Sequence, residues 1–400
     1  MRRPSNVILL LLSLMVALLL LEGGLRVAAR FMPMAQPDTL QSEPHLYDAY
    51  RSHRINPAFN TPANTEGRHI HSADGFRRAS PVSIIKPPRT IRILVMGGSA
   101  LYGIGSFAPY PPHPYLRNDE TITAHLEQML NAHLKETGSP VRTEVINCGV
   151  IAYQTFQHLV YLNQSLLNLH PDIVINFDGN NDFYITDRKY NHWEDYIYGS
   201  NILVQLINER RLLIAAHLFF RWLSPYSLIA GQVEKRLTGP LVETSLKKSK
   251  PTHAIQPCPK DDPACQEDVA RRTFLRALWQ INRLGQLEGY DHVVFLQPEV
   301  VFENPQALTP HDQAVQKTTL RNMNTEDVQA MVRLRGSFPT LFSKYGIGYH
   351  DVAELGPKTF PGEDLYLDYC HLTPAGSIKA AQAMFPVILD MVLRRAKAMR

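Results

Sequence analysis

Residues 91–99 read IRILVMGGS, a short apolar run that ends in two glycines and a serine. Short runs rich in β-branched residues are typical of strands buried inside a parallel sheet. Gly97 and Gly98 permit the sharp turn that would present Ser99 at the end of such a strand. This stretch therefore predicts a buried strand that delivers a serine to the edge of a sheet.

Four further short runs follow along the chain, and each contains β-branched or aromatic residues. They are Thr143–Asn147, Asp172–Phe177, His292–Leu296 and Gly348–Val352. Between and after them, apolar residues recur at helical spacing in segments 118–135, 155–169, 268–287, 325–345 and 374–396. Strands that alternate with helices predict an α/β fold with a parallel sheet of about five strands, covered on both faces.

Polar residues follow the predicted strands at the points where the strands end. Ligands of open parallel sheets bind outside the carboxyl ends of the strands. Ser99 follows the first predicted strand, Gly149 the second and Asn181 the third, while Asp368 and His371 come after the fifth. All five residues are therefore predicted to lie at one edge of the sheet.

These residue types are those that acyl transfer needs. A serine hydroxyl requires a base to remove its proton, and His371 can be that base, with Asp368 holding the imidazole. The tetrahedral oxyanion requires hydrogen-bond donors, which the backbone N–H groups of Ser99 and Gly149 and the side chain of Asn181 can supply. The pattern predicts an ester-cleaving site.

Each part also has a structural explanation when taken alone. Ser99 could cap a helix or line a phosphate cradle, although no Walker lysine follows it. Asn181 could be a turn residue, and Asp368 and His371 could simply precede a helix that starts near Pro374. The order of the three segments, and their placement after successive strands, favour one catalytic constellation.

The pattern resembles the SGNH (GDSL-type) hydrolase superfamily from about residue 72 to the C-terminus. The marker residues of that family are a serine, a glycine, an asparagine and a histidine in chain order, together with an aspartate. They are matched here by Ser99, Gly149, Asn181, His371 and Asp368. The resemblance implies a three-layer α/β/α, flavodoxin-like fold and hydrolysis of acyl esters, with transfer to a sugar hydroxyl in some members.

Two further segments look like those of membrane-anchored bacterial members. They are Asp74–Arg77 and Gln297–Pro298, and Gln297 is a candidate substrate-binding residue. One departure from the family is Gly98, which stands where the common Gly-Asp-Ser block has aspartate. That aspartate is not the triad acid, so its loss leaves the predicted chemistry in place.

The N-terminus predicts a membrane anchor. Arg2 and Arg3 precede an apolar run over residues 7–21, and helix can continue to about residue 30. We expect an uncleaved signal-anchor over residues 1–30, single-pass in the inner membrane, with the catalytic domain on the periplasmic or extracytoplasmic side. A cleaved signal peptide and a buried soluble helix are the alternatives.

The rest of the chain divides by composition. Residues 31–66 are rich in Pro, Asn, Ser and Thr and predict an extended tether, followed by a hydrolase-like domain over 67–400. An insertion at 188–262 interrupts the alternation and predicts a helical cap over the active-site end of the sheet, with 237–263 as a loop. A second membrane span at 202–222 is disfavoured because residues 209–211 are charged.

Charge and cysteine usage narrow the protein class further. The net charge of +4 is scattered, which does not indicate nucleic-acid binding. Cys258 and Cys265 lie in a turn-rich stretch and predict a local disulfide, typical of an oxidising compartment, in preference to a zinc site or free thiols. Cys148 and Cys370 are expected to be small apolar fillers near the site.

The predicted function is an exported, membrane-tethered serine esterase that removes acyl groups, such as acetyl, from an envelope carbohydrate or lipid. The predicted chemistry needs no metal or organic cofactor. An O-acyltransferase with the same triad is the first alternative, and a non-catalytic envelope binding protein on a hydrolase scaffold is the second. The sequence carries no signal for the oligomeric state.

Overall fold

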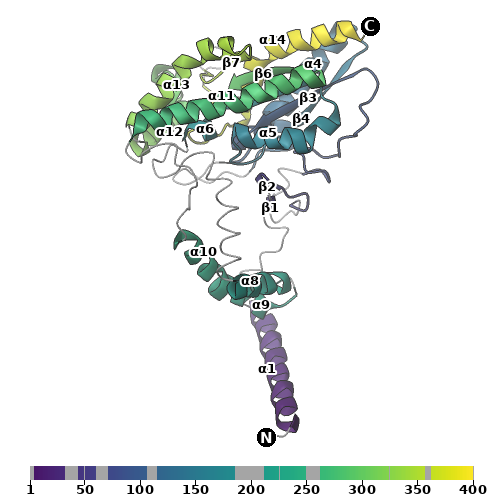
Figure 1. The fold of residues 1–400 in the computed structure, drawn as a ribbon, viewed down its shortest axis with the longest axis vertical. Coiled ribbons are helices and arrows are strands. Elements are labelled where there is room, and N and C mark those ends of the chain that lie inside the picture. Colours follow the sequence, from purple (N-terminus) through teal and green to yellow (C-terminus); the bar gives the residue numbers. More distant parts are fainter. Residues whose placement is uncertain are drawn as a thin grey trace. The chain divides into compact units, whose positions relative to one another are not determined.

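The computed structural model describes residues 4–31, 44–48, 50–59, 71–105, 115–184, 211–224, 226–248, 262–323, 325–355 and 362–399. The chain forms two compact units (Figure 1). Residues 45–197 and 255–400 make up an α/β unit, and residues 1–44 and 198–254 make up a helical unit.

The α/β unit is built on a five-stranded parallel sheet with the order β4-β3-β5-β6-β7. The strands are β3 (Thr90–Gly97), β4 (Arg142–Asn147), β5 (Ile173–Asp178), β6 (Asp291–Leu296) and β7 (Gly348–Asp351). Each predicted strand is present, with ends that differ by one residue at most. In chain order the strands stand 2-1-3-4-5, which is the flavodoxin-like arrangement, so the predicted fold class is confirmed.

Helices cover both faces of this sheet and complete three layers (Figure 1). The helices of eight or more residues in the α/β unit are α4 (Ile122–Glu136), α5 (Thr155–Gln164), α11 (Pro263–Glu288), α12 (Pro310–Asn322), α13 (Thr325–Lys344) and α14 (Pro374–Ala398). Shorter pieces are α3 (Ser99–Tyr102), η1 (Asn118–Glu120), η2 (Leu166–Leu169), α6 (Asn180–Tyr184), η4 (Val300–Phe302) and η5 (Pro305–Ala307).

The central strand β3 supplies side chains to both layers, because successive residues of a strand point to opposite faces. Ile91, Ile93 and Val95 belong to the core that α4 and α14 cover. Leu94 and Met96 belong to the core that α5 and α11 cover. The end of β3, where Ser99 follows, is therefore fixed by packing on two sides.

A two-stranded antiparallel hairpin precedes the sheet and was not predicted. Its strands are β1 (His45–Asp48) and β2 (Ser52–Ile55), and both belong to the α/β unit. The tether predicted over 31–66 is wrong for residues 45–55, which form this hairpin. The two strands are too short and polar to show a strand pattern in the sequence. Residues 32–43 and 60–66 lie outside the described residues.

The helical unit contains α1 (Pro4–Phe31), α8 (Arg211–Leu223), α9 (Leu228–Val233), η3 (Glu234–Thr238, a π-helical segment) and α10 (Gly239–Lys248). The described part of the insertion, 211–224 and 226–248, is thus mainly helical, and it belongs to one unit with the N-terminal helix. The loop predicted over 237–263 was wrong for residues 239–248, which form α10 and pack on α8. Residues 249–261, like 185–210, lie outside the described residues, and the predicted cap over the active site stays a prediction.

Among the described residues, one helix, α14, is long and apolar enough to cross a membrane. Half of its most apolar stretch is buried, because Met384, Ile388 and Val392 pack in the core of the sheet. This helix is therefore a core element of the α/β unit. The predicted N-terminal helix is present as α1, and its membrane insertion stays a prediction.

Candidate active site

Ser99 stands at the carboxyl end of the central strand, as predicted. It is the first residue of α3, which follows β3 after the single residue Gly98. A Cβ on Gly97 would lie 2.7 Å from the carbonyl oxygen of Phe177 on the neighbouring strand, so the close approach of the backbones requires glycine there. The tight turn leaves Ser99 only 8% exposed.

Three side chains separated along the sequence meet at this point. His371 Nε2 lies 2.7 Å from Ser99 Oγ, and His371 Nδ1 lies 2.7 Å from Asp368 Oδ2 and 2.8 Å from Oδ1. The imidazole therefore joins the hydroxyl and the carboxylate in one chain of hydrogen bonds. This is the arrangement in which a histidine can remove the serine proton while an aspartate holds the ring.

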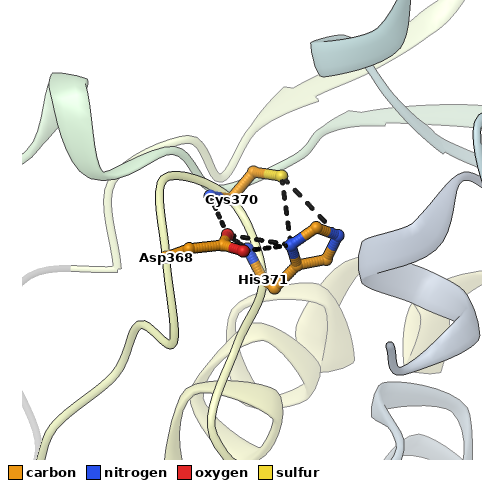
Figure 2. A group of neighbouring side chains, drawn as sticks. All are labelled: Asp368, Cys370 and His371. Carbon is orange, nitrogen blue, oxygen red and sulfur yellow. Dashed lines mark hydrogen bonds and ion pairs between the residues drawn. The ribbon is translucent and has the colours of Figure 1, made fainter. Parts of the chain in front are cut away.

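The loop that carries Asp368 and His371 is held by its own hydrogen bonds (Figure 2). The Asp368 carboxylate accepts from the backbone N–H groups of Cys370 and His371 at 3.1 and 2.9 Å. Thr373 then caps α14 by accepting from the backbone N–H of Gly376 at 3.0 Å. The segment therefore precedes a capped helix, as its structural interpretation predicts, and the same loop places His371 beside Ser99.

The electrostatics of the pair favour an ionised aspartate. Burial by itself would raise the pKa of Asp368, but the hydrogen bonds and the charge of His371 and the backbone N–H bonds leave that pKa below its usual value. Asp368 is therefore a carboxylate at neutral pH, as a group that orients and stabilises an imidazolium must be.

Asp368, Cys370 and His371 also form a group whose atoms lie close enough to share a metal ion (Figure 2). Burial raises the pKa of the Cys370 thiol well above its usual value, so the sulfur stays protonated and is a poor ligand. The His371 Nδ1 and the Asp368 carboxylate are already bonded to each other. The donor chemistry thus fits a catalytic pair better than a metal centre. Cys148 and Cys370 are free, buried thiols, as expected of fillers.

Two of the predicted oxyanion donors lie beside the serine. The Ser99 N–H is the first of α3, and a helix leaves its first N–H groups without partners inside the helix. Asn181 Nδ2 donates to the carbonyl oxygen of Tyr153 at 2.8 Å, which uses one of its two hydrogens. A Cβ on Gly98 would overlap Asn181 Nδ2, so the amide packs directly against the nucleophile turn.

This contact explains why glycine stands at position 98. An aspartate there would need a Cβ where the Asn181 amide lies. Glycine is therefore the residue that lets Asn181 approach the turn before Ser99.

Gly149 lies next to the same turn, but its N–H is already engaged. It donates to Asn147 Oδ1 at 2.9 Å, while Asn147 Nδ2 donates to the carbonyl oxygen of Leu101 at 2.8 Å. A Cβ on Gly149 would lie 2.7 Å from the backbone nitrogen of Tyr102, which requires glycine for close packing. Its role as an oxyanion donor stays a prediction that needs the bond to Asn147 to be shared or exchanged.

The hairpin that the sequence did not predict holds the loop carrying the Asn181 acceptor. Tyr153 Oη donates to the carbonyl oxygen of His53 at 2.5 Å, and His53 Nε2 lies 2.7 Å from the carbonyl oxygen of Ile151. Ala152 between them has a φ of 62°, a strained value for a residue with a Cβ. Hairpin, loop and Asn181 form one connected support for the site.

The segment Asp74–Arg77 supports the serine from the other side. Arg77 is buried, and its Nε donates to the carbonyl oxygen of Tyr102, the last residue of α3, at 2.9 Å. Burial lowers the pKa of Arg77 to about 10, which leaves the guanidinium charged. The residue therefore ties the end of the short serine-bearing helix to the domain.

Asp182, next to Asn181, links α6 to the start of α5. Its Oδ1 accepts from the Thr155 hydroxyl at 2.8 Å and from the Thr155 backbone N–H at 3.2 Å, and its Oδ2 has no partner among the described residues. Burial and the nearby charge of Asp178 raise the pKa of Asp182 to about 7. The sequence offered only a turn-forming Asn-Asp pair as a signal for this role.

Gln297 follows β6 and is buried, with 3% of its surface exposed. Its backbone N–H donates to the carbonyl oxygen of Asp178 at 3.0 Å, which extends the pairing of β5 and β6. A substrate-binding role for its side chain stays a prediction.

Comparison with known proteins finds only distant structural likenesses. No protein-family model and no curated protein matches the sequence. Solved structures similar to the chain include the acetyl xylan esterase AlAXEase, which is 12% identical with a TM-score of 0.36 over 74% of this chain and 100% of that one. The acetylxylan esterase Axe2 from Geobacillus stearothermophilus is 12% identical with a TM-score of 0.39, over 74% and 94%.

A lipase/acylhydrolase from Enterococcus faecalis is 13% identical, with a TM-score of 0.37 over 75% of this chain and 96% of that one. At such values the chemistry of the site has to come from its own atoms. The strand order and the residues along the catalytic edge agree with the resemblance to the SGNH hydrolase superfamily.

Proposed function

We propose that this protein is a serine ester hydrolase of the SGNH type, with Ser99 as nucleophile. The observation that carries the proposal is the position of His371, whose two ring nitrogens lie 2.7 Å from Ser99 Oγ and 2.7 Å from an Asp368 oxygen. A hydroxyl, a base and an orienting carboxylate in hydrogen-bond contact are the constellation that activates a serine.

In the proposed first half-reaction, Ser99 Oγ attacks the carbonyl carbon of an ester and His371 Nε2 takes the hydroxyl proton. The oxyanion receives hydrogen bonds from the Ser99 N–H and from the free hydrogen of the Asn181 amide. The carbon–oxygen bond of the ester breaks, and His371 returns its proton to the leaving alcohol. An acyl group then remains on Ser99.

In the second half-reaction, His371 takes a proton from water, and the hydroxide oxygen attacks the acyl carbon. The bond to Ser99 Oγ breaks, His371 protonates that oxygen, and a carboxylic acid leaves. The same intermediate would acylate a sugar hydroxyl if one replaced water. Hydrolysis is the proposed activity, and an O-acyltransferase is the alternative that uses the same groups.

We further propose that the enzyme is anchored by α1 and faces the extracytoplasmic side, acting on acyl esters, such as acetyl esters, of an envelope glycan or lipid. Two observations support this location. Each described side chain from 12 to 21 on α1 is exposed, and Cys265 is disulfide-bonded, which is typical of an oxidising compartment. Cys258, its predicted partner, lies outside the described residues.

A fluorophosphonate probe tests the nucleophile directly. The wild-type protein should be labelled once, and Ser99→Ala should abolish labelling while the circular dichroism spectrum stays unchanged. Ser377→Ala is a matched control, since Ser377 is also buried but has no partner in the described residues. Labelling of Ser99→Ala at the wild-type rate would exclude Ser99 as the nucleophile.

Product analysis separates the two enzymatic alternatives. With an aryl acetate as donor, a hydrolase should release acetate at the same rate with and without an added oligosaccharide. Accumulation of acetylated oligosaccharide at the expense of acetate would instead show a transferase. A complete lack of labelling and turnover would favour the non-catalytic alternative.

A further inference from the structure

Helix α8 of the helical unit carries a stripe of exposed apolar side chains. On α8 the exposed residues Leu212, Ala215, Leu218, Phe219 and Trp222 are spaced three or four apart, which places them in one stripe along the helix. Leu212 is 87% exposed, Phe219 53% and Trp222 66%. A surface helix of a water-soluble domain carries its polar residues on such a face.

The side chain of His217 on α8 instead points to the inside of the unit. His217 Nδ1 lies 3.2 Å from Thr238 Oγ1 and 3.8 Å from Glu234 Oε1, and both the histidine and the glutamate are largely buried. The outward apolar stripe is continued by exposed Tyr226 after the helix. Large exposed apolar surfaces of this kind mark contact with a partner or a membrane.

The contacts of α8 and α9 with α1 identify which of these covers the stripe. The described residues 12–21 of α1 are exposed at every position, hence all round the helix. A helix that is apolar on all sides is covered all round only in a protein core or in lipid. Glu22 is the first residue after this stretch that is not fully exposed.

Glu22 joins the end of the apolar stretch to the start of α9. Its carboxylate accepts from the backbone N–H groups of Leu228 and Ile229 at 2.9 and 3.1 Å and from the Ser227 hydroxyl at 2.9 Å. Arg26 bonds to the same carboxylate and donates to the carbonyl oxygen of Tyr226 at 2.7 Å. These bonds fix the start of α9 at the C-terminal end of α1, and α8 packs on α9 (Figure 1).

We infer that α8 is an in-plane membrane helix, whose stripe of Leu212, Leu218, Phe219 and Trp222 enters the acyl-chain boundary of the bilayer that α1 crosses. Aromatic residues near the end of a membrane helix are typical of the interface, and exposed Arg221 and Arg236 fit anionic headgroups. The helical unit would then rest on the membrane surface as a platform. This inference depends on the proposed insertion of α1 and not on the proposed esterase chemistry.

The test uses the full chain in vesicles of phosphatidylcholine and phosphatidylglycerol. A nitrobenzoxadiazole dye is attached to a cysteine in Phe219→Cys, and in Leu212→Cys as a second position on the stripe. Leu19→Cys reports on α1, and Leu287→Cys, 81% exposed on α11 of the α/β unit, is the matched control. Wild-type protein should take up no dye, since its free thiols Cys148 and Cys370 are buried.

The dyes at 219 and 212 should lose most of their emission to a lipid spin-labelled near its headgroup and should be protected from iodide. The dye at 287 should show the opposite behaviour, and the dye at 19 should be quenched by a spin label deeper in the acyl chain. Quenching at 19 with iodide access at 219 and 212 would overturn the inference and leave the anchor in place. Protection of 219 and 212 from both quenchers would also overturn it, because a protein surface would then cover the stripe. Loss of lipid quenching at all three positions would overturn the anchor together with the platform.

Discussion

The two units of this chain differ in how they expose apolar side chains. In the α/β unit, β3 is buried at every residue, and the buried polar groups of the site are bonded to one another. In the helical unit, Leu212, Phe219 and Trp222 of α8 are exposed, while Glu22 and His217 are largely buried and hydrogen-bonded. This is the difference expected if the helical unit meets lipid, as we propose, because apolar faces are stable against lipid and not against water.

The comparison also separates catalysis from membrane contact in our proposals. The described residues that do chemistry in our proposal all belong to the α/β unit, and the residues that we expect to meet lipid all belong to the helical unit. Changes in one unit should therefore leave the property of the other unchanged.

Asp368→Asn should have the largest effect. An amide cannot hold the His371 tautomer or stabilise the imidazolium, so kcat on an aryl acetate should fall by about 10³–10⁴-fold with membrane attachment unchanged. Steady-state kinetics and vesicle co-sedimentation measure the two properties. Asp390→Asn, at an exposed aspartate of α14, is the control and should keep full activity. Wild-type kcat in Asp368→Asn would refute the proposed triad.

Gly98→Ala should come next. The added Cβ would occupy the space of Asn181 Nδ2 and displace the oxyanion donor, which should lower kcat by about 10²-fold. The loss should not add to that of Asn181→Ala in the double variant, because both changes remove the same donor. Gly336→Ala is the matched control, since a Cβ there meets no atom within 4 Å. If the two losses of kcat added fully, Gly98→Ala would not act through the Asn181 amide.

Glu22→Ala tests the helical unit alone. It removes the acceptor for Leu228 N–H, Ile229 N–H and the Ser227 hydroxyl, which should destabilise the start of α9 by about 1–3 kcal/mol. Hydrogen exchange should speed up over residues 227–230 and stay the same over β3, with kcat on a soluble ester unchanged. Glu22→Gln keeps one acceptor oxygen, so its exchange rate over residues 227–230 should lie between those of the wild-type protein and Glu22→Ala. Equal exchange over residues 227–230 in all three proteins would show that the Glu22 contacts do not hold α9.

Asp182→Asn should have the smallest effect and depends on pH. The folded pKa of about 7 lies above the usual value of an aspartate, so the folded state binds the proton more tightly than the unfolded chain. Wild-type stability should therefore fall as pH rises from about 4 through 7. The variant keeps an oxygen for Thr155 and carries no charge, so its Tm should fall less between pH 5 and pH 8 than that of the wild-type protein. An identical decrease in Tm in both proteins would show that the group responsible for the pH dependence is not Asp182.

The strands and the reactive residues were predictable because their signals are local. Each buried strand is a short apolar run, and each reactive residue follows such a run, so the rule for strand ends placed Ser99, Asn181 and Asp368 correctly at one edge. The hairpin His45–Ile55 was missed because its strands are polar and short, and their stability comes from contacts with Ile151 and Tyr153 far along the chain.

The finer geometry of the site needed the fold. Whether the Gly149 N–H is free depends on the side chain of Asn147, and the reason for Gly98 is a contact with Asn181 on another strand end. Likewise, the disposition of Glu22 depends on the start of α9, about 200 residues later. No periodicity or spacing reports such contacts, because they join segments that are distant in sequence.

The sequence alone determined the order of strands and helices, the chemical types at the strand ends and the apolar run of α1, since each is written in neighbouring residues. Tertiary structure decided which of them meet. Packing of β3 between two helical layers brought Ser99 within 2.7 Å of a histidine 272 positions away. The bonds of Glu22 hold the start of α9 at the end of α1, and α8 packs on α9 with its apolar stripe outward. The type of a side chain limits the chemistry that it can perform, and the packing of the chain decides which groups it contacts.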